Sequence, residues 1–106
     1  MPTTFTVYIL RCADGSLYIG RTPSLQARLA RHAQGQGCQY TAHRLPVTLV
    51  WQEHHASWET AFAREAQLKR WSRAKKEALV RGDIPTLKQL SRRRARSAPD
   101  GDALRA

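Results

Sequence analysis

Acidic residues, cysteines and long apolar runs are all scarce in this sequence, and each scarcity narrows what the chain can be. Only 8 Asp and Glu accompany 18 Lys and Arg, so the formal charge is +10 and polyanions, above all nucleic acid, are the favoured partners. Cys12 and Cys38 lie 26 residues apart with no CxxC or Cys/His ligand spacing, so free thiols are expected and a zinc site is not. No apolar stretch approaches the roughly 20 residues of a membrane span, and no signal peptide precedes the first strand pattern. We therefore expect a cytoplasmic protein with no membrane partner.

The residues that are abundant suffice for one hydrophobic core. Apolar residues make up 42% of the 106-residue chain, and they include three Trp and three Tyr. We expect a folded domain over residues 1–82 and a basic extension over 83–106 that is partly helical and then disordered. Residues 1–82 hold 12 Lys and Arg against 5 Asp and Glu, and residues 83–106 hold 6 against 3, so the folded part is itself basic.

The hydrophobic pattern predicts the element order ββαβαα. β-branched and aromatic residues alternate in the strand segments, and apolar residues recur at helical spacing in the others. Thr22 followed by Pro23, then Ser57 and Ser72, are predicted N-caps, and Gly82 is a predicted helix end. This order favours an α+β fold with a small, mainly antiparallel sheet. The predicted strands are 5–11, 16–21 and 47–52; the predicted helices are 23–33, 57–71 and 72–80, with a loop over 34–45, one or two helical turns over 83–90 and a tail from residue 92.

Glu65 falls on the apolar side of the second predicted helix. Advancing about 100° per residue places its carboxylate with Ala61 and Leu68, and with Trp58 and Phe62. An unpaired buried carboxylate is strongly unfavourable, so Glu65 is expected to be paired, to hold a cation or to lie at the edge of a cleft. Lys69, four residues on, offers the simpler explanation of an ordinary helical ion pair.

The first predicted helix repeats this pattern with two cationic or titratable residues. Arg28 follows Leu25 by three positions and His32 follows Leu29 by three, so both face the sheet side. Long side chains often reach solvent from such positions, which is the alternative explanation. An inward Arg, an inward Glu and a tyrosine-rich hairpin on successive elements favour a common site.

The hairpin makes a separate prediction about its two tyrosines. A two-residue Asp14-Gly15 turn would place Tyr8 and Tyr18 on opposite faces of the sheet. A three-residue Ala13-Asp14-Gly15 loop with Gly15 left-handed would place both on one face. We predict the three-residue loop, because only that register assembles a site; the alternative role of both tyrosines is simple core packing.

These same residues carry a likeness to a known family. Thr6-Val7-Tyr8 and Tyr18-Ile19-Gly20 open the chain, and Arg28-Leu29, His32 and Glu65 follow. In this combination the sequence resembles the GIY-YIG nuclease superfamily. The segments CADGSLYIG, YTAHRLPVTLVW and REAQLKRWSRAKKEAL are similar to the small stand-alone bacterial members, over about residues 4–82.

The resemblance implies a three-stranded antiparallel sheet flanked by helices, and hydrolysis of nucleic-acid phosphodiesters with one Mg²⁺ (or Mn²⁺). It implies that Tyr8 is the general base or a base relay and that Glu65 holds the metal. Arg28 would stabilise the transition state, Tyr18 would orient water or phosphate, and His32 would be the reserve candidate for proton transfer. A phenol is a weak base at neutral pH, so we expect nearby positive charge from Arg28, Arg21 or the metal to favour phenolate.

Two departures from the family pattern leave an alternative open. The first tripeptide is Thr6-Val7-Tyr8 in place of Gly-Ile-Tyr, and the chain has no asparagine to match one that several nuclease members carry. A catalytically weak or inactive nucleic-acid-binding module on the same scaffold is therefore the second hypothesis.

Binding to nucleic acid, DNA in preference to RNA, is expected through phosphate contacts that do not discriminate sequence, so a protein partner is a possible source of specificity. The predicted nucleic-acid-binding residues are Arg21, Tyr40, Arg44, Lys69, Arg70, Arg73, Lys75 and Lys76. For Tyr40 and Arg44 the alternative explanation is that they anchor the loop over residues 34–45.

Overall fold

A three-stranded antiparallel sheet forms the centre of the first part of the chain, as predicted. The computed structural model describes the backbone of residues 4–97 and the side chains of residues 4–91. The chain divides into two compact units between Arg70 and Trp71, earlier than the predicted boundary after Gly82. The strands are β1 (Phe5–Arg11), β2 (Leu17–Thr22) and β3 (Thr48–His55), in the order β2-β1-β3.

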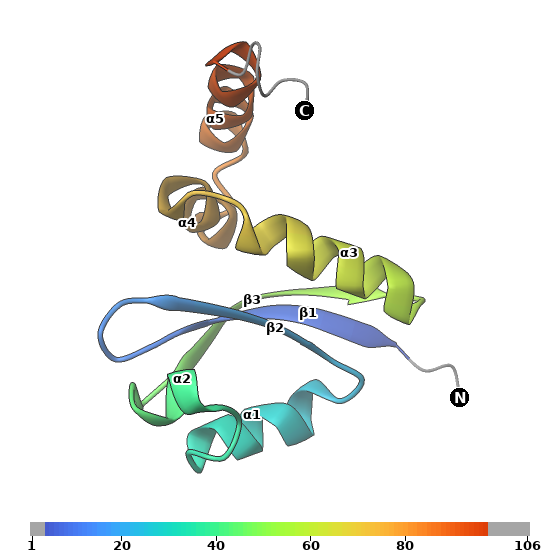
Figure 1. Cartoon of the computed structure of the whole chain (residues 1–106), viewed down its shortest axis with the longest axis vertical. Helices are drawn as coiled ribbons and strands as arrows, with labels where there is room; N and C mark the ends of the chain where they lie inside the picture. Colours follow the sequence, from blue (N-terminus) through green and yellow to red (C-terminus); the bar gives the residue numbers. More distant parts are fainter. Residues whose placement is uncertain (1–3, 98–106) are drawn as a thin grey trace. The chain divides into compact units, whose positions relative to one another are not determined.

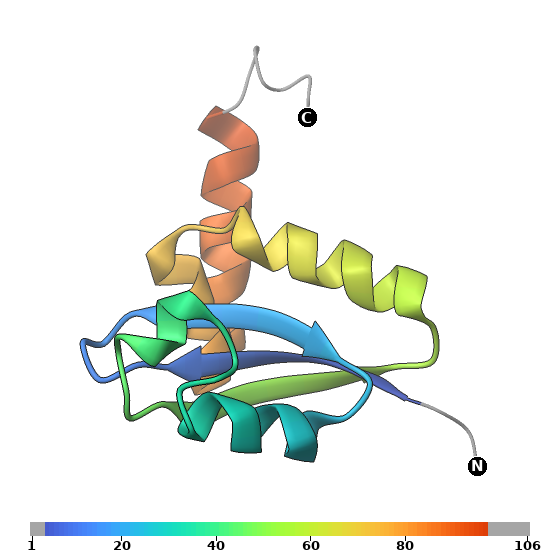
Figure 2. The same cartoon turned by 60° about the horizontal axis from the view of Figure 1, so that its bottom comes forward.

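The central strand β1 is covered on both faces. Its residues Val7, Tyr8, Ile9 and Leu10 have no exposed surface, which explains why the strand is a near-continuous apolar run. Helix α3 (Trp58–Lys69) lies on one face of the sheet, while α1 (Leu25–Ala33) and the short α2 (Gln39–Ala42) lie on the other (Figure 1). Figure 2 shows α1 and α2 from a second direction, below and in front of the strands.

The hairpin has the predicted three-residue loop. Tyr8 pairs with Gly20 and Leu10 with Tyr18, the register in which both tyrosines share a face. The Cys12 amide donates to the Ser16 carbonyl at 2.8 Å, and Gly15 has a left-handed φ of 87°. The loop length therefore decides which side chains of β2 join Tyr8.

The segment around α1 and α2 differs from the prediction in two places. Helix α1 begins at Leu25, because the Thr22 hydroxyl accepts from the Ser24 amide at 3.1 Å and forms a local turn in place of a helix cap. Residues 34–45, predicted as a loop, contain α2, in which the Ala42 amide donates to the Cys38 carbonyl at 3.0 Å. A single helical turn is too short to leave a hydrophobic repeat in the sequence.

Helix α3 begins as predicted, since the Ser57 hydroxyl accepts from the Thr60 amide at 3.1 Å. Its inner face is formed by Ala61, Glu65 and Leu68. The predicted apolar stripe is wrong for Trp58 and Phe62, which are 39% and 54% exposed and whose rings lie against the guanidinium of Arg21 from β2.

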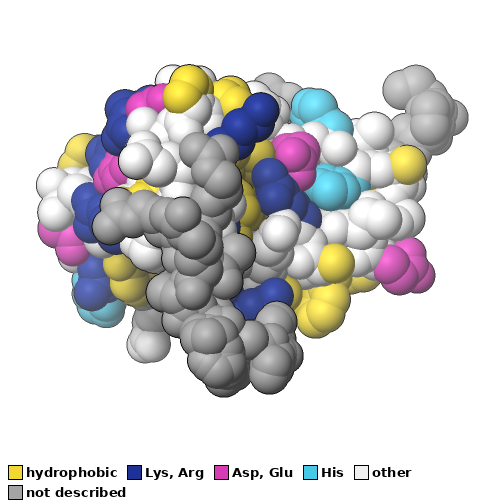
Figure 3. All heavy atoms as spheres, turned by 90° about the horizontal axis from the view of Figure 1, so that it is seen from above, with side chains coloured by type: hydrophobic (Ala, Val, Ile, Leu, Met, Phe, Trp, Pro, Cys, Tyr) yellow, Lys and Arg dark blue, Asp and Glu magenta, His cyan; other side chains and the backbone are white. Residues whose placement is uncertain are grey.

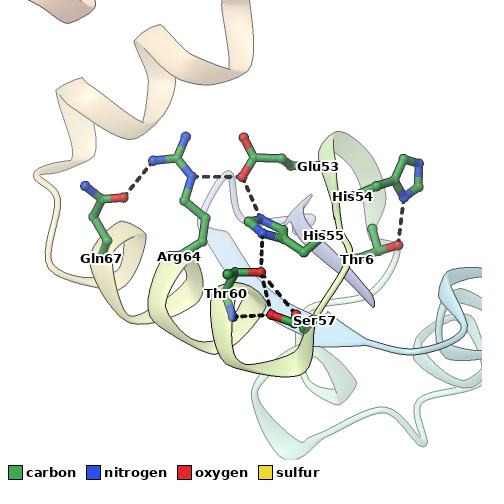
Figure 4. Close-up of polar contacts among 8 residues, drawn as sticks. All are labelled: Thr6, Glu53, His54, His55, Ser57, Thr60, Arg64 and Gln67. Carbon is green, nitrogen blue, oxygen red and sulfur yellow. Dashed lines mark hydrogen bonds and ion pairs between the residues drawn. The ribbon is translucent and has the colours of Figure 1, made fainter. Parts of the chain in front are cut away.

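Strand β3 extends three residues beyond its predicted end and ties α3 to the sheet (Figure 4). The Glu53 carboxylate accepts from Arg64 at 3.0 Å and pairs with His55 at 2.9 Å. His55 also contacts the Thr60 hydroxyl at 3.1 Å. These polar side chains bridge the extended part of β3 to the first two turns of the helix.

The second unit contains α4 (Arg73–Arg81) and α5 (Ile84–Ser97), which pack on each other. The predicted caps of α4 are confirmed: the Ser72 hydroxyl accepts from the Lys75 amide at 3.2 Å, and Gly82 has a φ of 71°. The predicted tail is wrong for residues 92–97, whose backbone continues α5; residues 98–106 lie outside the described part. None of the described helices combines the length and apolarity needed to cross a bilayer.

Candidate active site

A chain of hydrogen bonds buried between β1, α1 and α2 links three polar side chains. The Tyr8 hydroxyl lies 3.1 Å from His32 Nε2, and His32 Nδ1 lies 2.8 Å from Thr41 Oγ1. All three residues have no exposed surface. The inward position of His32 is thereby explained by two hydrogen bonds, and the alternative that it reaches solvent is wrong.

Tyr18 completes the ring cluster on this face. Its ring centroid lies 6.4 Å from that of Tyr8 and 5.4 Å from that of His32, and it is half-buried. The rings meet at interplanar angles of 46° and 60°, the tilted arrangements that aromatic pairs prefer. Tyr18 is therefore the tyrosine of the pair that is partly open to solvent.

Two glycines make room for this cluster. A Cβ added at Gly20 would lie 2.5 Å from the Tyr8 oxygen, and one added at Gly37 would lie 2.6 Å from Cε1 and Cγ of His32. Such distances are far below contact distance, so both positions exclude a side chain. Gly20 belongs to the hairpin motif, whereas Gly37 lies in the segment before α2 and had no assigned role.

Burial controls the protonation of these groups. It raises the pKa of Tyr8, and the positive charge of nearby Arg28 offsets only part of that rise. Arg28 thus favours phenolate, as expected, but burial outweighs it and the pKa of Tyr8 is raised in the protein alone. Burial also raises the pKa of Tyr18, and burial together with Arg28 and Arg31 lowers the pKa of His32. At neutral pH the site holds two phenols and a neutral imidazole.

Arg28 belongs to the same cluster through its charge. It is half-buried on α1, and it acts on the pKa of Tyr8, Tyr18 and His32. An arginine that keeps its charge beside neutral hydrogen-bonding groups is suited to hold an anion such as phosphate.

Glu65 approaches the sheet from the opposite side. It is 8% exposed, and its carboxylate forms ion pairs with Arg21 of β2 and, at 3.1 Å, with Lys69. Pairing with Lys69 is the simpler explanation offered by the sequence, and Arg21 adds a second partner. The Glu65 charge nevertheless contributes to the raised pKa of Tyr8, so the two groups are electrostatically coupled across the edge strand β2.

Arg21 itself serves the packing of α3. Its guanidinium lies 4.7 Å from the Trp58 ring centroid and 4.6 Å from that of Phe62, and its Nε is buried without a hydrogen-bond partner. This environment holds Arg21 against Glu65 and leaves it less available to nucleic acid than predicted.

Tyr40 and Arg44 anchor the segment around α2, which was the alternative considered for them. The Arg44 guanidinium lies 3.9 Å over the Tyr40 ring and donates to Asp14 of the hairpin loop at 3.1 Å. The other ring contact of Tyr40 is stacking on Tyr18, with centroids 6.0 Å apart. These contacts hold α2 against the hairpin, next to the buried hydrogen bonds between Tyr8, His32 and Thr41.

The predicted phosphate-binding cations differ in exposure. Lys69 and Arg70 in the first unit and Arg73 in the second are exposed, and Lys76 is half-buried. Lys75 is buried with its ammonium 4.3 Å from the Trp71 ring centroid, so its predicted contact with nucleic acid does not fit its position. Figure 3 shows Lys and Arg side chains interspersed with acidic, histidine and hydrophobic ones on the face it views.

No pattern in the sequence indicated a role for Thr41 or Gly37. Thr41 stands in YTAHR, a segment noted only for family likeness, and no repeat marks it as inward-facing. A local sign that Thr41 faces inward is its position three residues after Cys38, because from there its hydroxyl donates to the Cys38 carbonyl at 3.4 Å. Both cysteines are free thiols, as predicted.

Comparisons with known proteins identify the class. The GIY-YIG catalytic domain family model matches residues 4–78, and the chain belongs to this family, whose members are nuclease-type domains. The UPF0213 protein of Streptococcus sanguinis is 48% identical over 75 residues, covering 71% of this chain and 86% of that protein. A UPF0213 protein of Staphylococcus aureus is 44% identical, covering 71% and 92%.

A solved structure supports the same assignment. The solution NMR structure of the UPF0213 protein BH0048 from Bacillus halodurans is 44% identical to this chain. It superposes with a TM-score of 0.50 and covers 73% of this chain and 82% of that one.

Proposed function

We propose that this protein is a metal-dependent endonuclease that hydrolyses nucleic-acid phosphodiesters in the cytoplasm, with DNA preferred to RNA. The observation that supports it most is the buried bond between Tyr8 and neutral His32, with the charge of Arg28 beside it. A buried acid next to a neutral base serves proton transfer, and a packed core needs neither.

In the proposed reaction Tyr8 is a proton relay. The phenolic proton passes to His32 Nε2, and the phenolate oxygen accepts a proton from the attacking water. The lowered pKa of His32 keeps Nε2 available as an acceptor at neutral pH. Tyr8 has no exposed surface in the protein alone, so this relay requires that the bound substrate bring the attacking water to the Tyr8 oxygen.

Arg28 and Tyr18 act on the phosphate in this proposal. Arg28 offers a planar guanidinium that matches two phosphate oxygens and stabilises charge that develops in the transition state, an effect typically worth roughly 3 to 4 kcal/mol. Tyr18, half-buried and protonated, donates a hydrogen bond to water or phosphate.

Glu65 is the proposed metal ligand, and its surroundings are compatible with that role. Mg²⁺ commonly binds through one or two carboxylates and keeps several waters. The carboxylate oxygen Oε2 faces the ammonium of Lys69, whose side chain is 55% exposed and can therefore turn to solvent when a metal binds. Bound there, hydrated Mg²⁺ or Mn²⁺ would neutralise charge on the phosphate. Arg21 would keep the other oxygen, Oε1, in place.

The positively charged surface supports nucleic acid as the substrate. Exposed Lys69, Arg70 and Arg73 contact phosphates in this proposal, and half-buried Lys76 adds to the field. Such contacts position a duplex without selecting a sequence, so specificity would come from the shape of the substrate or from a protein partner.

Plasmid nicking with Mg²⁺ or Mn²⁺ tests the proposal. Wild type should convert supercoiled to nicked plasmid, and Glu65→Gln and Tyr8→Phe should each lower the rate about 10²-fold or more. Glu53→Gln is the matched control, because it removes an ion-paired carboxylate from β3 and should keep near-wild-type activity. Nicking that survives in Glu65→Gln would overturn the proposal.

One observation favours the alternative of a binding module without turnover. Both carboxylate oxygens of Glu65 are engaged by cations, an arrangement that also serves as a purely structural ion pair. In that case wild-type protein would retain salt-sensitive DNA binding and would show no nicking with any divalent metal.

A further inference from the structure

We propose that Thr41 is a positioning residue that holds His32 in the Nδ1–H tautomer, so that Nε2 is left free to accept the Tyr8 proton. This inference rests on the proposed function, because it assigns the device that sets the direction of the relay. It adds a residue of α2 to a site otherwise drawn from β1, β2, α1 and α3.

Counting donors and acceptors fixes the direction of the chain. The Thr41 hydroxyl has one hydrogen, and it donates to Cys38, whose carbonyl oxygen lies at 3.4 Å and whose Sγ lies at 3.5 Å. Its oxygen is therefore an acceptor for His32 Nδ1–H at 2.8 Å. His32 Nε2 is then unprotonated and accepts the Tyr8 hydrogen at 3.1 Å. In this arrangement each of the three hydrogens has an acceptor.

The reversed arrangement leaves a group unsatisfied. If Thr41 donated to Nδ1, His32 Nε2–H would point at the Tyr8 oxygen, and the Tyr8 hydrogen would need another acceptor. Tyr8 has no exposed surface, so water does not replace the missing partner, and a buried unpaired hydroxyl is unfavourable by about 1 to 3 kcal/mol. The forward direction is therefore the stable one.

The surroundings of His32 keep the ring in place and neutral. The groups that face it are Tyr8 from β1, Tyr18 from β2, and Arg28 and Arg31 from α1, with Thr41 from α2. Gly37 lies against the ring, because a Cβ added there would lie 2.6 Å from its Cε1 and Cγ. Since both arginines oppose a second proton on the ring, the tautomer is the remaining variable, and Thr41 determines it.

Imidazole nitrogen NMR of the free protein tests the tautomer directly. In water neutral histidine prefers Nε2–H, so an Nδ1–H signal from His32 in wild type would require a protein acceptor such as Thr41. Thr41→Val, which keeps the shape and removes the hydroxyl, should convert His32 to Nε2–H, and Thr41→Ser should retain Nδ1–H. Wild type with Nε2–H, or Thr41→Val with Nδ1–H, would overturn the inference.

Cleavage assays give the second readout. Thr41→Val should lower kcat about 10²-fold with little change in DNA affinity, and Thr41→Ser should restore it to within about twofold. Thr22→Val is the matched control, a buried threonine whose hydroxyl serves a local turn away from His32. An equal loss in both valine variants would mean a structural role and overturn the inference. A wild type with Nδ1–H and no cleavage would contradict the nuclease proposal alone.

Discussion

The two faces of the sheet solve the burial of polar groups in different ways. Between the sheet and α1 and α2, Tyr8, His32 and Thr41 are buried as neutral groups joined by directional hydrogen bonds. Between the sheet and α3, Glu65 is buried as a charge and is paired with half-buried Arg21, while Lys69 reaches in from solvent. The hydrogen-bonded groups on the α1 and α2 side are held in fixed positions, whereas the charged groups on the α3 side can exchange ion-pair partners.

This difference suits a division of labour in the proposed reaction. Proton transfer requires hydrogen-bond partners held within a few tenths of an ångström, which a neutral, close-packed face provides. Metal and phosphate binding requires that charges be released and replaced, which the half-open ion pairs around Glu65 permit. The edge strand β2 contributes to both faces, through Gly20 and Arg21 in succession.

The largest expected effect comes from filling the space beside His32. Gly37→Ala would place a Cβ 2.6 Å from ring carbons of His32, which should destabilise the protein by about 1 to 3 kcal/mol and reduce cleavage about 10²-fold. Urea denaturation and plasmid nicking measure the two effects. Gly82→Ala is the control: it meets no atom within 4 Å and strains only its left-handed backbone. Full activity in Gly37→Ala would show that the relay face tolerates displacement.

Acid should lower the stability of the folded protein, because His32 on the α1 and α2 side of the sheet is buried in its neutral form. Its pKa is lowered by burial and by Arg28 and Arg31, so between that lowered value and the usual one near 6.5 the unfolded chain binds a proton that the folded chain does not. The contribution of neutral His32 to the free energy of unfolding is fully present above pH 6.5, and it is lost as the pH falls through the pKa of His32 in the folded protein. Urea midpoints measured from pH 7.5 down to 5 should therefore fall, and the fall should be smaller in His32→Gln.

His43→Gln is the control for that measurement, because His43 is exposed and should leave the pH dependence unchanged. At the alkaline end the raised pKa of Tyr8 predicts stability that is complete below about pH 10 and is lost above it. A His32→Gln variant with the wild-type acid response would contradict the assignment.

The smallest expected effect concerns the charged face. Lys69→Gln removes a cation that competes for Glu65, so Mn²⁺ binding without DNA, followed by water-proton relaxation, should tighten about two- to fivefold at low salt. Arg70→Gln makes the same charge change at the next residue, which is not a partner of Glu65 in the structure, and should change the affinity less. Equal effects of the two substitutions would argue against Glu65 as the ligand.

The sequence predicted the parts of the fold that depend on local chemistry. The hairpin register followed from the requirement that Tyr8 and Tyr18 share a face, and the starts of α3 and α4 followed from Ser57 and Ser72. Helical periodicity also placed Glu65 and His32 inward, as the structure has them. Each of these features is determined within a few neighbouring residues.

Features that depend on residues distant in the chain were missed. Arg21 comes from β2 to pair with Glu65, and no periodicity in either segment indicates that partner. The exposure of Trp58 and Phe62 was missed in the same way, because their rings lie against Arg21, which comes from β2. Thr41 was missed because a single helical turn carries no repeat, so the residue proposed to position His32 left no mark in the sequence pattern.

The three-residue hairpin loop limits how this sequence can change by insertion or deletion. Removing one residue from Ala13-Asp14-Gly15 would shift β2 by one position against β1, turning Tyr18 toward α3 and Arg21 toward His32. A single deletion would therefore remove Tyr18 from the cluster around His32 and Arg21 from the ion pair with Glu65. A length change at the tip is therefore tolerable only in even numbers, although no residue of the loop belongs to the proposed catalytic set.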